Sequence, residues 1–298
     1  MSNTALILVL GSGGQVGREL MRIPLPDGMK RCGLDHGELD ITDREAVAAA
    51  VREVGTDLVV NAAAYTAVDK AESEPERAFA VNCGGATNVA DACAAAGATL
   101  VHLSTDYVFD GEKDGAYMED DPVHPLCVYG ASKAAGEAAV RSSCPRHVVL
   151  RTAWVYGVFG RNFVKTMLHL AETRDEVAVV DDQRGCPTAA ADIAVAILDI
   201  AQAPAPRWGT YHYCGSGTSW YSFAREIFDI AAPVTARRPA LRAISTADYP
   251  TPARRPRNAV LDCARIGAAF GIRPQPRRDA LRRVLDELLR DRRVREAT

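Results

Sequence analysis

The stretch "ALILVLGSGGQVG", residues 5–17, decides the fold of this chain. Its first six residues form an unbroken apolar run, which is typical of a β-strand buried on both faces of a parallel sheet. Gly11, Gly14 and Gly17 follow at three-residue spacing, and "QVGRELMR" then continues as a helix. Glycine permits a tight turn, so the stretch predicts a buried strand joined closely to the amino terminus of a helix.

Strand-like and helix-like segments alternate from this stretch onward. Four further strands are predicted: one ending near residues 32–35, and others at 57–63, 98–104 and 147–152. Helices are expected at 42–55 and 75–97, the first with Thr42 and Glu45 at capping-box spacing. Such alternation forms right-handed βαβ units, so we expect an α/β protein with a doubly wound parallel sheet covered by helices on both faces.

The glycine turn suits one kind of ligand in particular. Its backbone can approach a pyrophosphate closely, and the amino terminus of the following helix favours negative charge. A tight strand-to-helix turn needs glycine even without a ligand, so the glycines alone are a weak signal. Their place in the first unit of an alternating chain strengthens that signal, and the pattern predicts a Rossmann-type dinucleotide site.

Asp35 lies at the end of the second predicted strand, where an acidic side chain accepts hydrogen bonds from an adenosine ribose. A carboxylate there disfavours a 2′-phosphate, which tilts the expectation slightly towards NADH. The neighbouring His36 offsets that tilt, and a solvated turn aspartate is the alternative interpretation. The expected cofactor is therefore NADPH or NADH.

The alternating pattern loosens after about Val158, where proline-rich pieces such as "APAPRWG" and "YPTPARRPR" interrupt it. We interpret this part as a smaller C-terminal substrate domain interleaved with the last elements of the sheet. The expected Rossmann domain comprises residues 1–157, with later sheet elements from about 176–213. The smaller domain then comprises residues 158–175 and 214–298.

Bulk properties argue against several classes of protein. The 298 residues are 48% hydrophobic and 24% charged, with a net charge of −3, so no basic field favours nucleic acid or an anionic membrane. We see neither a signal peptide at the amino terminus nor an apolar run near the roughly 20 residues of a membrane helix. Eight scattered cysteines without zinc spacing indicate reduced thiols and a cytoplasmic location.

The segment "VYGASKAAGE", residues 128–137, contains a candidate catalytic pair, Tyr129 and Lys133. In a helix, Tyr129 and Lys133 stand on one face, one turn apart, and the small residues around them let another group come close. A phenol with a pKa of about 10 is a poor acid near neutrality. We expect the Lys133 ammonium to lower that pKa and to hold the ribose hydroxyls of a nicotinamide. A surface helix that merely carries the pair is the alternative.

Three predicted strands end in small, hydroxyl or aromatic residues: "NAAAYT", "STDYVFDG" and "RTAWVYG". Ligands of open α/β sheets bind outside the carboxyl ends of the strands, so these endings suit a flat ring and a sugar. Thr105 is expected to donate a hydrogen bond to a substrate oxygen, although a single hydroxyl there can simply cap its strand. No residue supplies a hydride, so the cofactor must.

A second basic feature lies near the end of the chain, in "ARRPRNAVLD". It brings Arg254, Arg255 and Arg257 together in the sequence, and guanidinium groups suit a nucleotide diphosphate. A solvated basic loop explains the same residues equally well, and the sequence leaves both interpretations open.

Together these motifs resemble those of the extended short-chain dehydrogenase/reductase superfamily. Within it, several blocks are similar to the dTDP-4-dehydrorhamnose reductase family: "GQVG", "NAAAYTAVDKAE", "STDYVFDG", "YGASKAAGE", "LRTAWVYG", "NFV" and "DDQRGCPT". They occur in order and cover most of the chain to about Thr188. The resemblance implies NAD(P)H-dependent reduction of the C4 keto group of dTDP-4-dehydro-L-rhamnose, the last step to dTDP-L-rhamnose.

The resemblance also implies roles for individual residues. Tyr129 is expected to be the proton donor, with Lys133 as the motif lysine and Thr105 as the threonine of "STD". The residues expected to contact the cofactor, including the glycine turn, are Gly11, Gly14, Gln15, Val16, Gly17, Asp35, Asp40, Ile41, Ala63, Ala64, Tyr65, Tyr129 and Lys133. The expected sugar contacts are Thr105, Asp106 and Trp154, the last through its apolar ring face.

Some members of the family bind Mg²⁺ at a dimer interface through acidic residues of two chains. Glu19 and Glu287 match two of those positions, but the stretch after "GCPT" reads "AAADIA" and lacks a glutamate. We therefore predict no metal site and regard Mg²⁺ as a doubtful cofactor. The protein is expected to be a monomer or a homodimer that binds a small nucleotide sugar, and neither nucleic acid nor membrane.

Two alternative functions stay open at this point. One is a reductase of another nucleotide 4-keto-6-deoxysugar, which would keep the same fold and the same Tyr/Lys pair. The other is a non-catalytic regulatory subunit of methionine adenosyltransferase type, against which the complete set of Tyr129, Lys133 and Thr105 argues.

Overall fold

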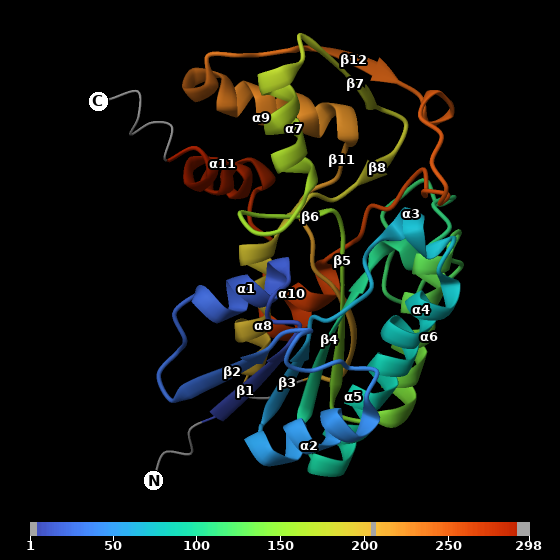
Figure 1. The fold of residues 1–298 in the computed structure, drawn as a ribbon, viewed down its shortest axis with the longest axis vertical. Coiled ribbons are helices and arrows are strands. Elements are labelled where there is room, and N and C mark those ends of the chain that lie inside the picture. The colour runs from blue at the N-terminus through green and yellow to red at the C-terminus, as the bar shows by residue number, and fades with distance from the viewer. Residues whose placement is uncertain (1–4, 204–206, 291–298) are drawn as a thin grey trace.

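The computed structural model describes residues 5–203 and 207–290. Six strands form the central sheet in the order β10-β5-β4-β3-β1-β2 (Figure 1), and all neighbours are parallel. Their bounds are β1 (Ala5–Leu10), β2 (Met29–Leu34), β3 (Leu58–Asn61), β4 (Thr99–Thr105), β5 (His147–Thr152) and β10 (Gly209–His212). The five strands predicted from the sequence are present, and the expected α/β fold with a parallel sheet is confirmed.

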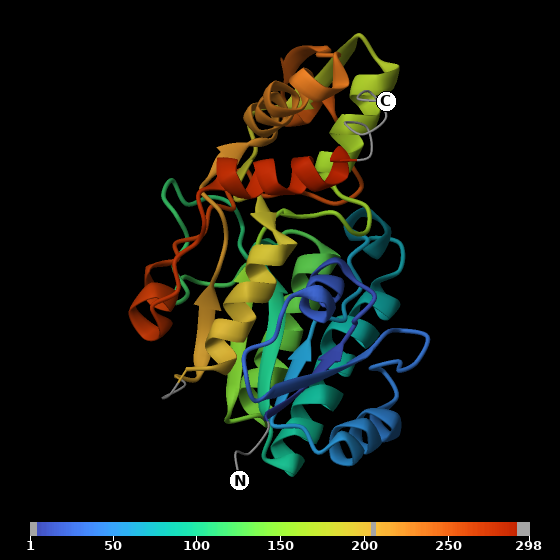
Figure 2. The ribbon, with the colours of Figure 1, turned by 90° about the vertical axis from the view of Figure 1, so that its left-hand side faces the viewer.

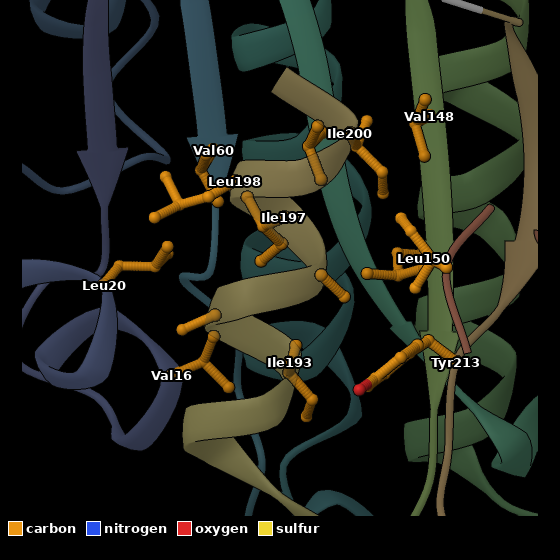
Figure 3. Packing of buried hydrophobic residues seen from close by; sticks show 14 of the residues in the cluster. Val16, Leu20, Val60, Val148, Leu150, Ile193, Ile197, Leu198, Ile200 and Tyr213 are labelled. Atoms are coloured by element: carbon orange, nitrogen blue, oxygen red, sulfur yellow. The ribbon is translucent and has the colours of Figure 1, made fainter. Parts of the chain in front are cut away.

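Helices cover both faces of this sheet. On one face lie α1 (Gln15–Arg22), α8 (Ala190–Ala201) and α10 (Ala264–Phe270). Figure 3 shows this packing, with Ile193 and Ile197 of α8 between the α1 side chains and Leu150 of the sheet. On the other face lie α2 (Arg44–Val54), α5 (Ala86–Ala96) and α6 (Val128–Ser143). The sheet is therefore doubly wound, as expected.

Two predicted helices differ from the structure in detail. The capping residue of α2 is Asp43, whose carboxylate accepts from the backbone N–H groups of Glu45 and Ala46, so the expected cap at Thr42 is wrong. The reason is that Thr42 is already bound through its N–H and hydroxyl to Asp40, both at 2.9 Å. The helix at 75–97 is present, but as α4 (Pro75–Phe79), a π-helical segment (Ala80–Gly85) and α5.

A second group of elements stands over the carboxyl ends of the strands (Figure 2). It contains α7 (Phe163–Thr173), β7 (Glu176–Val180), α9 (Trp220–Thr235), β12 (Ala240–Ile244) and α11 (Arg277–Leu288). These elements enclose their own apolar core, which includes Met167, Val177, Phe223, Ile227 and Leu281. Burial of this separate core explains why the alternating pattern of the sheet stops in this part of the chain.

The pairing of β7 refines the proposed division of the chain. β7 pairs with β12 rather than with the large sheet, so of residues 176–213 only β10 joins that sheet. The division into a Rossmann unit and a smaller unit remains a proposal. Residues 1–4 and 291–298 of those two units lie outside the described residues.

Short elements complete the chain. They are α3 (Val68–Ala71), β6 (Val155–Tyr156), β8 (Arg184–Gly185), β9 (Thr188–Ala189), β11 (Thr218–Ser219) and two 3-10 turns (Asp106–Val108 and Thr246–Asp248). β6 pairs with β9, and β11 pairs with β8. Within the described ranges, no helix has the length and apolar character needed to cross a membrane.

The small residues of α6 let this helix lie unusually close to its neighbours. A Cβ atom on Gly130 would overlap the carbonyl oxygen of Tyr107, and one on Gly136 would overlap that of Asn82. Asn82 belongs to the π-helical segment, where its amide bonds Tyr65 and the hydroxyl of Ser132 in α6. Glycine at these two positions therefore allows α6 to pack closely against both segments. This close packing explains the small residues of "VYGASKAAGE".

A buried ion pair joins α6 to the sheet. Glu137 accepts from Arg151 of β5 at 2.8 and 2.7 Å and from the hydroxyl of Ser104 at 2.6 Å. Glu137 and Arg151 are 0% and 2% exposed, so neither charge has water as a partner. The bidentate geometry and the extra hydroxyl satisfy the carboxylate, as a buried charge requires. This contact sets the position of α6 along the sheet.

We predict that Gly136→Ala lowers the free energy of unfolding by about 2–3 kcal/mol, because the added methyl group overlaps the Asn82 carbonyl and separates the helices. Urea unfolding followed by circular dichroism measures the change. Gly84→Ala is the matched control: Gly84 is exposed in the neighbouring helical segment, and its Cβ would lie 4.0 Å from the Phe79 oxygen. If the two variants were equally stable, the close approach at Gly136 would not constrain the fold.

Candidate active site

Two adjoining cavities open at the carboxyl ends of the strands. The Asp35 cavity, about 640 Å³, lies over β1, β2 and β3. The Tyr129 cavity, about 600 Å³, lies over β4, β5 and the start of α6, and Trp220 of the smaller group also lines it. Four residues line both cavities: Gly13, Gly14, Ala62 and Ala64. Together the cavities form one continuous elongated site along the glycine turn.

The structure brings nearly all of the predicted site residues to these cavities. The Asp35 cavity is lined by Gly11, Gly14, Asp35, Asp40, Ile41, Ala63, Ala64 and Tyr65. The Tyr129 cavity is lined by Gly14, Gln15, Val16, Ala64, Thr105, Asp106, Tyr129, Lys133 and Trp154. Gly17 lines neither cavity, and a Cβ on it would overlap the Gly11 carbonyl, so it serves the close packing of α1 on the turn. Contact of each residue with a ligand stays a prediction.

The glycine turn is shaped for a negatively charged group. Gly11 has a φ of 77°, and a Cβ on it would lie 2.6 Å from the backbone nitrogen of Ala63. Gly14 precedes the first residue of α1 and provides no side-chain cap. The N–H groups that open α1 are therefore free of a capping side chain and carry the positive end of the helix dipole. This arrangement fits a pyrophosphate, as the sequence predicts.

Asp35 is held against this turn by its own loop. Its Oδ1 accepts from the backbone N–H groups of Gly37 and Glu38, at 2.8 and 3.2 Å. The cavity beside it is also lined by His36, Arg18 and Arg77. The two arginines were not predicted, because they lie on separate helices with no motif to mark them. The cavity is thus lined by two carboxylates, those of Asp35 and Asp40, and by cationic side chains around them.

Tyr129 is buried in its cavity, beside Tyr107 in an edge-to-face contact of 5.5 Å between ring centroids. Burial raises the pKa of the Tyr129 phenol well above its usual range, and a hydrogen bond with Thr105 opposes this rise. The expectation that Lys133 lowers the pKa of Tyr129 is therefore wrong for this structure. The phenol is held in its protonated form.

The reason lies in the position of the Lys133 side chain. Its Nζ donates to the backbone carbonyl of Leu103 at 2.7 Å and lies 3.4 Å from Nε2 of His102. The ammonium is thus engaged by β4 rather than by the phenol. Burial lowers the pKa of Lys133 to about 8, and the nearby charge of Glu137 partly opposes this. An amine that loses its proton near neutrality is unusual, and such groups concentrate at functional sites.

Two polar atoms of the Tyr129 cavity have no partner among the described residues: Oδ2 of Asp106 and Oγ1 of Thr152. The other Asp106 oxygen accepts from Thr105 at 3.0 Å. Burial raises the pKa of Asp106 to about 7, with the Thr105 hydrogen bond as a smaller opposing effect. Buried polar atoms are nearly always paired, so these two indicate a site for a polar ligand.

Trp154 faces the same cavity in a constrained conformation. Its φ is 46°, in the left-handed region that a bulky residue rarely occupies, and its ring stacks on Trp220 with centroids 3.4 Å apart. A Cβ on Gly185 would overlap the indole, so glycine there makes room for the ring. Sequence reasoning missed Trp220, because it lies on α9 of the smaller group and only the folded chain brings it to the strand ends. Arg161 also lines the cavity and carries no motif. Thr66 and Val68 line it as well; they lie in the quoted block "NAAAYTAVDKAE" after β3, but neither was singled out.

The three arginines near the end of the chain are separated in the structure. Arg255 forms a bidentate pair with Asp69, at 3.0 and 2.9 Å, and lines a third cavity of about 350 Å³ together with Trp220. Arg257 pairs with Asp114 at 3.1 Å on the surface, and Arg254 is exposed. Of the three, Arg255 is therefore the one placed beside a ligand-sized cavity, next to the Tyr129 cavity.

The acidic residues considered for Mg²⁺ have a different partner. Arg22 donates to Glu19 and to Glu287, in each case with its shortest distance at 2.5 Å. A guanidinium therefore stands where a cation would have to bind, and these residues do not fit a metal ion. Over residues 5–203 and 207–290, no group of three or more His, Cys, Asp or Glu side chains is placed to hold a metal.

Known proteins share this fold and much of this sequence. The family model described as "RmlD substrate binding domain" matches residues 5–290. A dTDP-4-dehydrorhamnose reductase of Sinorhizobium fredii is 46% identical over 289 residues, covering 95% of this chain and 97% of that protein. A crystal structure of dTDP-4-dehydrorhamnose reductase from Bacillus anthracis in complex with NADP has a TM-score of 0.90 and 35% identity, covering 95% of this chain and 99% of that one. The corresponding Clostridium acetobutylicum structure has a TM-score of 0.90 and 37% identity, with the same coverage.

We predict that Lys133→Met stabilises the ligand-free protein near neutral pH. Burial lowers the pKa of Lys133 from 10.5 to about 8. The unfolded chain therefore binds this proton more tightly, and folding carries a cost of about 3 kcal/mol below pH 8 that disappears as pH rises towards 10.5. The variant also loses the hydrogen bond to Leu103, which offsets part of this gain. Its free energy of unfolding should therefore exceed that of the wild type by about 1–2 kcal/mol at pH 7 and by nothing at pH 10.

Urea unfolding of the wild type and the variant at pH 7 and pH 10 measures this difference. Lys30→Met, which changes an exposed lysine on β2, is the control and should show no such dependence on pH. Two results would contradict a destabilising effect of the buried Lys133 ammonium. One is a Lys133→Met protein that is less stable than the wild type at pH 7, and the other is the same change in the free energy of unfolding at both pH values.

Proposed function

The chain belongs to the RmlD substrate binding domain family, and we propose that it reduces the C4 keto group of dTDP-4-dehydro-L-rhamnose to give dTDP-L-rhamnose. The single observation that carries this proposal is the meeting of Tyr129, Lys133 and Thr105 in one buried cavity beside the glycine turn. NADPH or NADH, bound along the two joined cavities, supplies the hydride. The protein is therefore an NAD(P)H-dependent oxidoreductase.

Tyr129 acts as the proton donor to the oxygen of the reduced carbonyl. A donor must carry its proton when the reaction begins, and burial keeps the Tyr129 phenol protonated. Thr105, in hydrogen-bonding contact with the phenol, is placed to orient the same oxygen. The cavity excludes bulk water from the phenol, which strengthens its interaction with developing negative charge.

Lys133 stands one turn along α6 from Tyr129 and lines the same cavity. Its Nζ lines the Tyr129 cavity while it donates to the Leu103 carbonyl. From there it is proposed to bind the ribose hydroxyls of the nicotinamide half. The helix face that carries both residues is placed by Gly130 and Gly136, so the packing of α6 sets the geometry of the reaction.

Asp106 and Trp154 bind the sugar. The unpaired Oδ2 of Asp106 is available to a sugar hydroxyl, and the Trp154 ring gives an apolar wall that is stiffened by its stack on Trp220. The nucleotide half then extends past Trp220 into the third cavity, between α7, β7 and β12. Arg255 stands at that cavity with its guanidinium held by Asp69, in a position suited to a diphosphate.

The alternatives differ in how well they use these features. A reductase of another nucleotide 4-keto-6-deoxysugar would use the same residues, so the product must decide between the two. A non-catalytic subunit would need neither a buried lysine nor unpaired polar atoms in the cavity. A cytoplasmic location is part of the proposal and is supported by the eight cysteines, all free thiols. The proposal allows a monomer or a homodimer.

We predict that Tyr129→Phe lowers kcat by about a thousandfold, because the phenol is the group that gives its proton to the reduced carbonyl. The measurement is NAD(P)H oxidation with dTDP-4-dehydro-L-rhamnose, and cofactor affinity should change by less than about threefold. Tyr211→Phe is the control, since the Tyr211 hydroxyl bonds the Arg207 carbonyl away from the cavities. Undiminished turnover in Tyr129→Phe would reject the assignment of the donor.

We also predict that Asp35→Asn shifts the preference between cofactors towards NADPH. The amide keeps an oxygen for Gly37 and Glu38 but removes the charge that opposes a 2′-phosphate. The ratio of kcat/KM for NADPH to that for NADH should rise about tenfold. Glu38→Gln, which alters a neighbouring carboxylate that does not line the cavity, should leave the ratio within about twofold. An unchanged ratio in Asp35→Asn would show that Asp35 does not face the ribose.

A further inference from the structure

A buried chain of three polar side chains runs behind the catalytic lysine. Asn61 of β3, His102 of β4 and Lys133 of α6 are exposed by no more than 1%, 1% and 2%. The Asn61 amide nitrogen lies 3.2 Å from Nδ1 of His102, and Nε2 of His102 lies 3.4 Å from Nζ of Lys133. His102 therefore joins the lysine to the next strand of the sheet.

The hydrogen bonds determine which nitrogen of His102 carries the proton. Oδ1 of Asn61 accepts from the backbone N–H of Ala63 at 3.2 Å, so the other end of the amide, the NH₂ group, faces His102. Nδ1 of His102 must then accept, and in a neutral ring the proton lies on Nε2. Burial holds the pKa of His102 well below its usual value, with smaller effects of Lys133 and His147 in the same direction, so the ring is neutral.

This tautomer presents an N–H group to Lys133. If the lysine is an ammonium, two donors face each other across 3.4 Å and neither can accept. If the lysine is a neutral amine, its lone pair accepts the Nε2 hydrogen, and its own N–H still donates to Leu103. The surroundings of Lys133 therefore stabilise the neutral amine relative to the ammonium, beyond the effect of burial alone, and so make the ammonium a stronger acid.

The other titratable groups around Lys133 do not reverse this preference. Glu137, one turn along α6, is occupied by Arg151, Ser104 and Arg141. Asp106 and Tyr129 line the same cavity from the segment after β4 and from α6. Burial favours the neutral form of both. His147 contacts the Cys144 carbonyl, not the lysine.

We propose that His102 is a positioning residue that makes Lys133 the proton reservoir for Tyr129, by donating its Nε2 hydrogen to the neutral amine that remains after the Lys133 ammonium has released its proton. This inference rests on the proposed function. After Tyr129 gives its proton to the substrate oxygen, the Lys133 ammonium passes one proton across the cavity to the phenolate, and the neutral amine that remains accepts the hydrogen bond of His102. Solvent then returns one proton to Lys133. In each turnover one proton therefore moves from solvent through Lys133 and Tyr129 to the product.

The first test measures the tautomer in the ligand-free wild-type protein and needs no activity. Nitrogen-15 NMR of the imidazole rings, with the His102 signals assigned by correlation to its own backbone resonances in the wild-type protein, should show a neutral ring with its proton on Nε2 between pH 5 and pH 8. A proton on Nδ1, or a doubly protonated ring, overturns the proposal. This measurement uses no variant, so it stands whether or not His102→Leu folds.

The second test is the dependence of kcat on pH for His102→Leu. Without the donor the neutral amine is less favoured, so the alkaline limb of the profile should move up by about one pH unit. In the same variant kcat at pH 7 should fall about three- to tenfold, while KM stays within about twofold. His147→Leu, a buried histidine on the adjacent strand that does not contact Lys133, is the control and should leave the limb in place.

The outcomes separate this inference from the proposed function. A wild-type protein without activity on the nucleotide sugar would reject the proposed function. Wild-type activity with an alkaline limb that does not move in His102→Leu, or moves equally in His147→Leu, would reject the role of His102 alone.

Discussion

The close contact of α6 with the turn after β4 and with the π-helical segment is the constraint on which the rest of the site depends. Gly130 lies directly against the Tyr107 carbonyl and Gly136 against that of Asn82, so the helix can approach to a distance that no side chain would permit. The buried pair of Glu137 and Arg151 then sets the position of the helix along the sheet. Because of these contacts, Tyr129 and Lys133 enter the cavity from a rigid helix.

Burial shifts the pKa values of the ionisable groups in this cavity. Three groups in one cavity depart from their ordinary acidity because of burial: Tyr129 stays protonated, Lys133 titrates near pH 8 and Asp106 near pH 7. Near pH 7 the shifts of Lys133 and Asp106 cost stability, whereas that of Tyr129 does not, because a phenol is protonated in the unfolded chain as well. Shifts of this kind concentrate at functional sites. Trp154 and Trp220 stack on each other and line the cavity on the side of the smaller group.

Local patterns in the sequence were sufficient for the sheet and for most of the site. The apolar run at Ala5–Leu10 and the glycines after it predict a strand and a tight turn from neighbouring residues alone. The alternation of strands and helices then predicts which residues lie at the strand ends. The sequence does not show which of several neighbouring side chains caps a helix. Asp40 accepts a hydrogen bond from the Thr42 hydroxyl, and Asp43 caps α2 instead. Contacts between distant segments were equally hidden. The Leu103 carbonyl engages Lys133, and α9 brings in Trp220, although no motif marks either contact.

The most direct measurement is a crystal structure of this protein with NADP⁺ and dTDP-L-rhamnose bound together. The account predicts that the rhamnose O4 lies within hydrogen-bonding distance of the Tyr129 hydroxyl, with the ring of the sugar against Trp154 and C4 facing the nicotinamide. A sugar bound with its O4 away from Tyr129, or a nicotinamide outside the Tyr129 cavity, would contradict it.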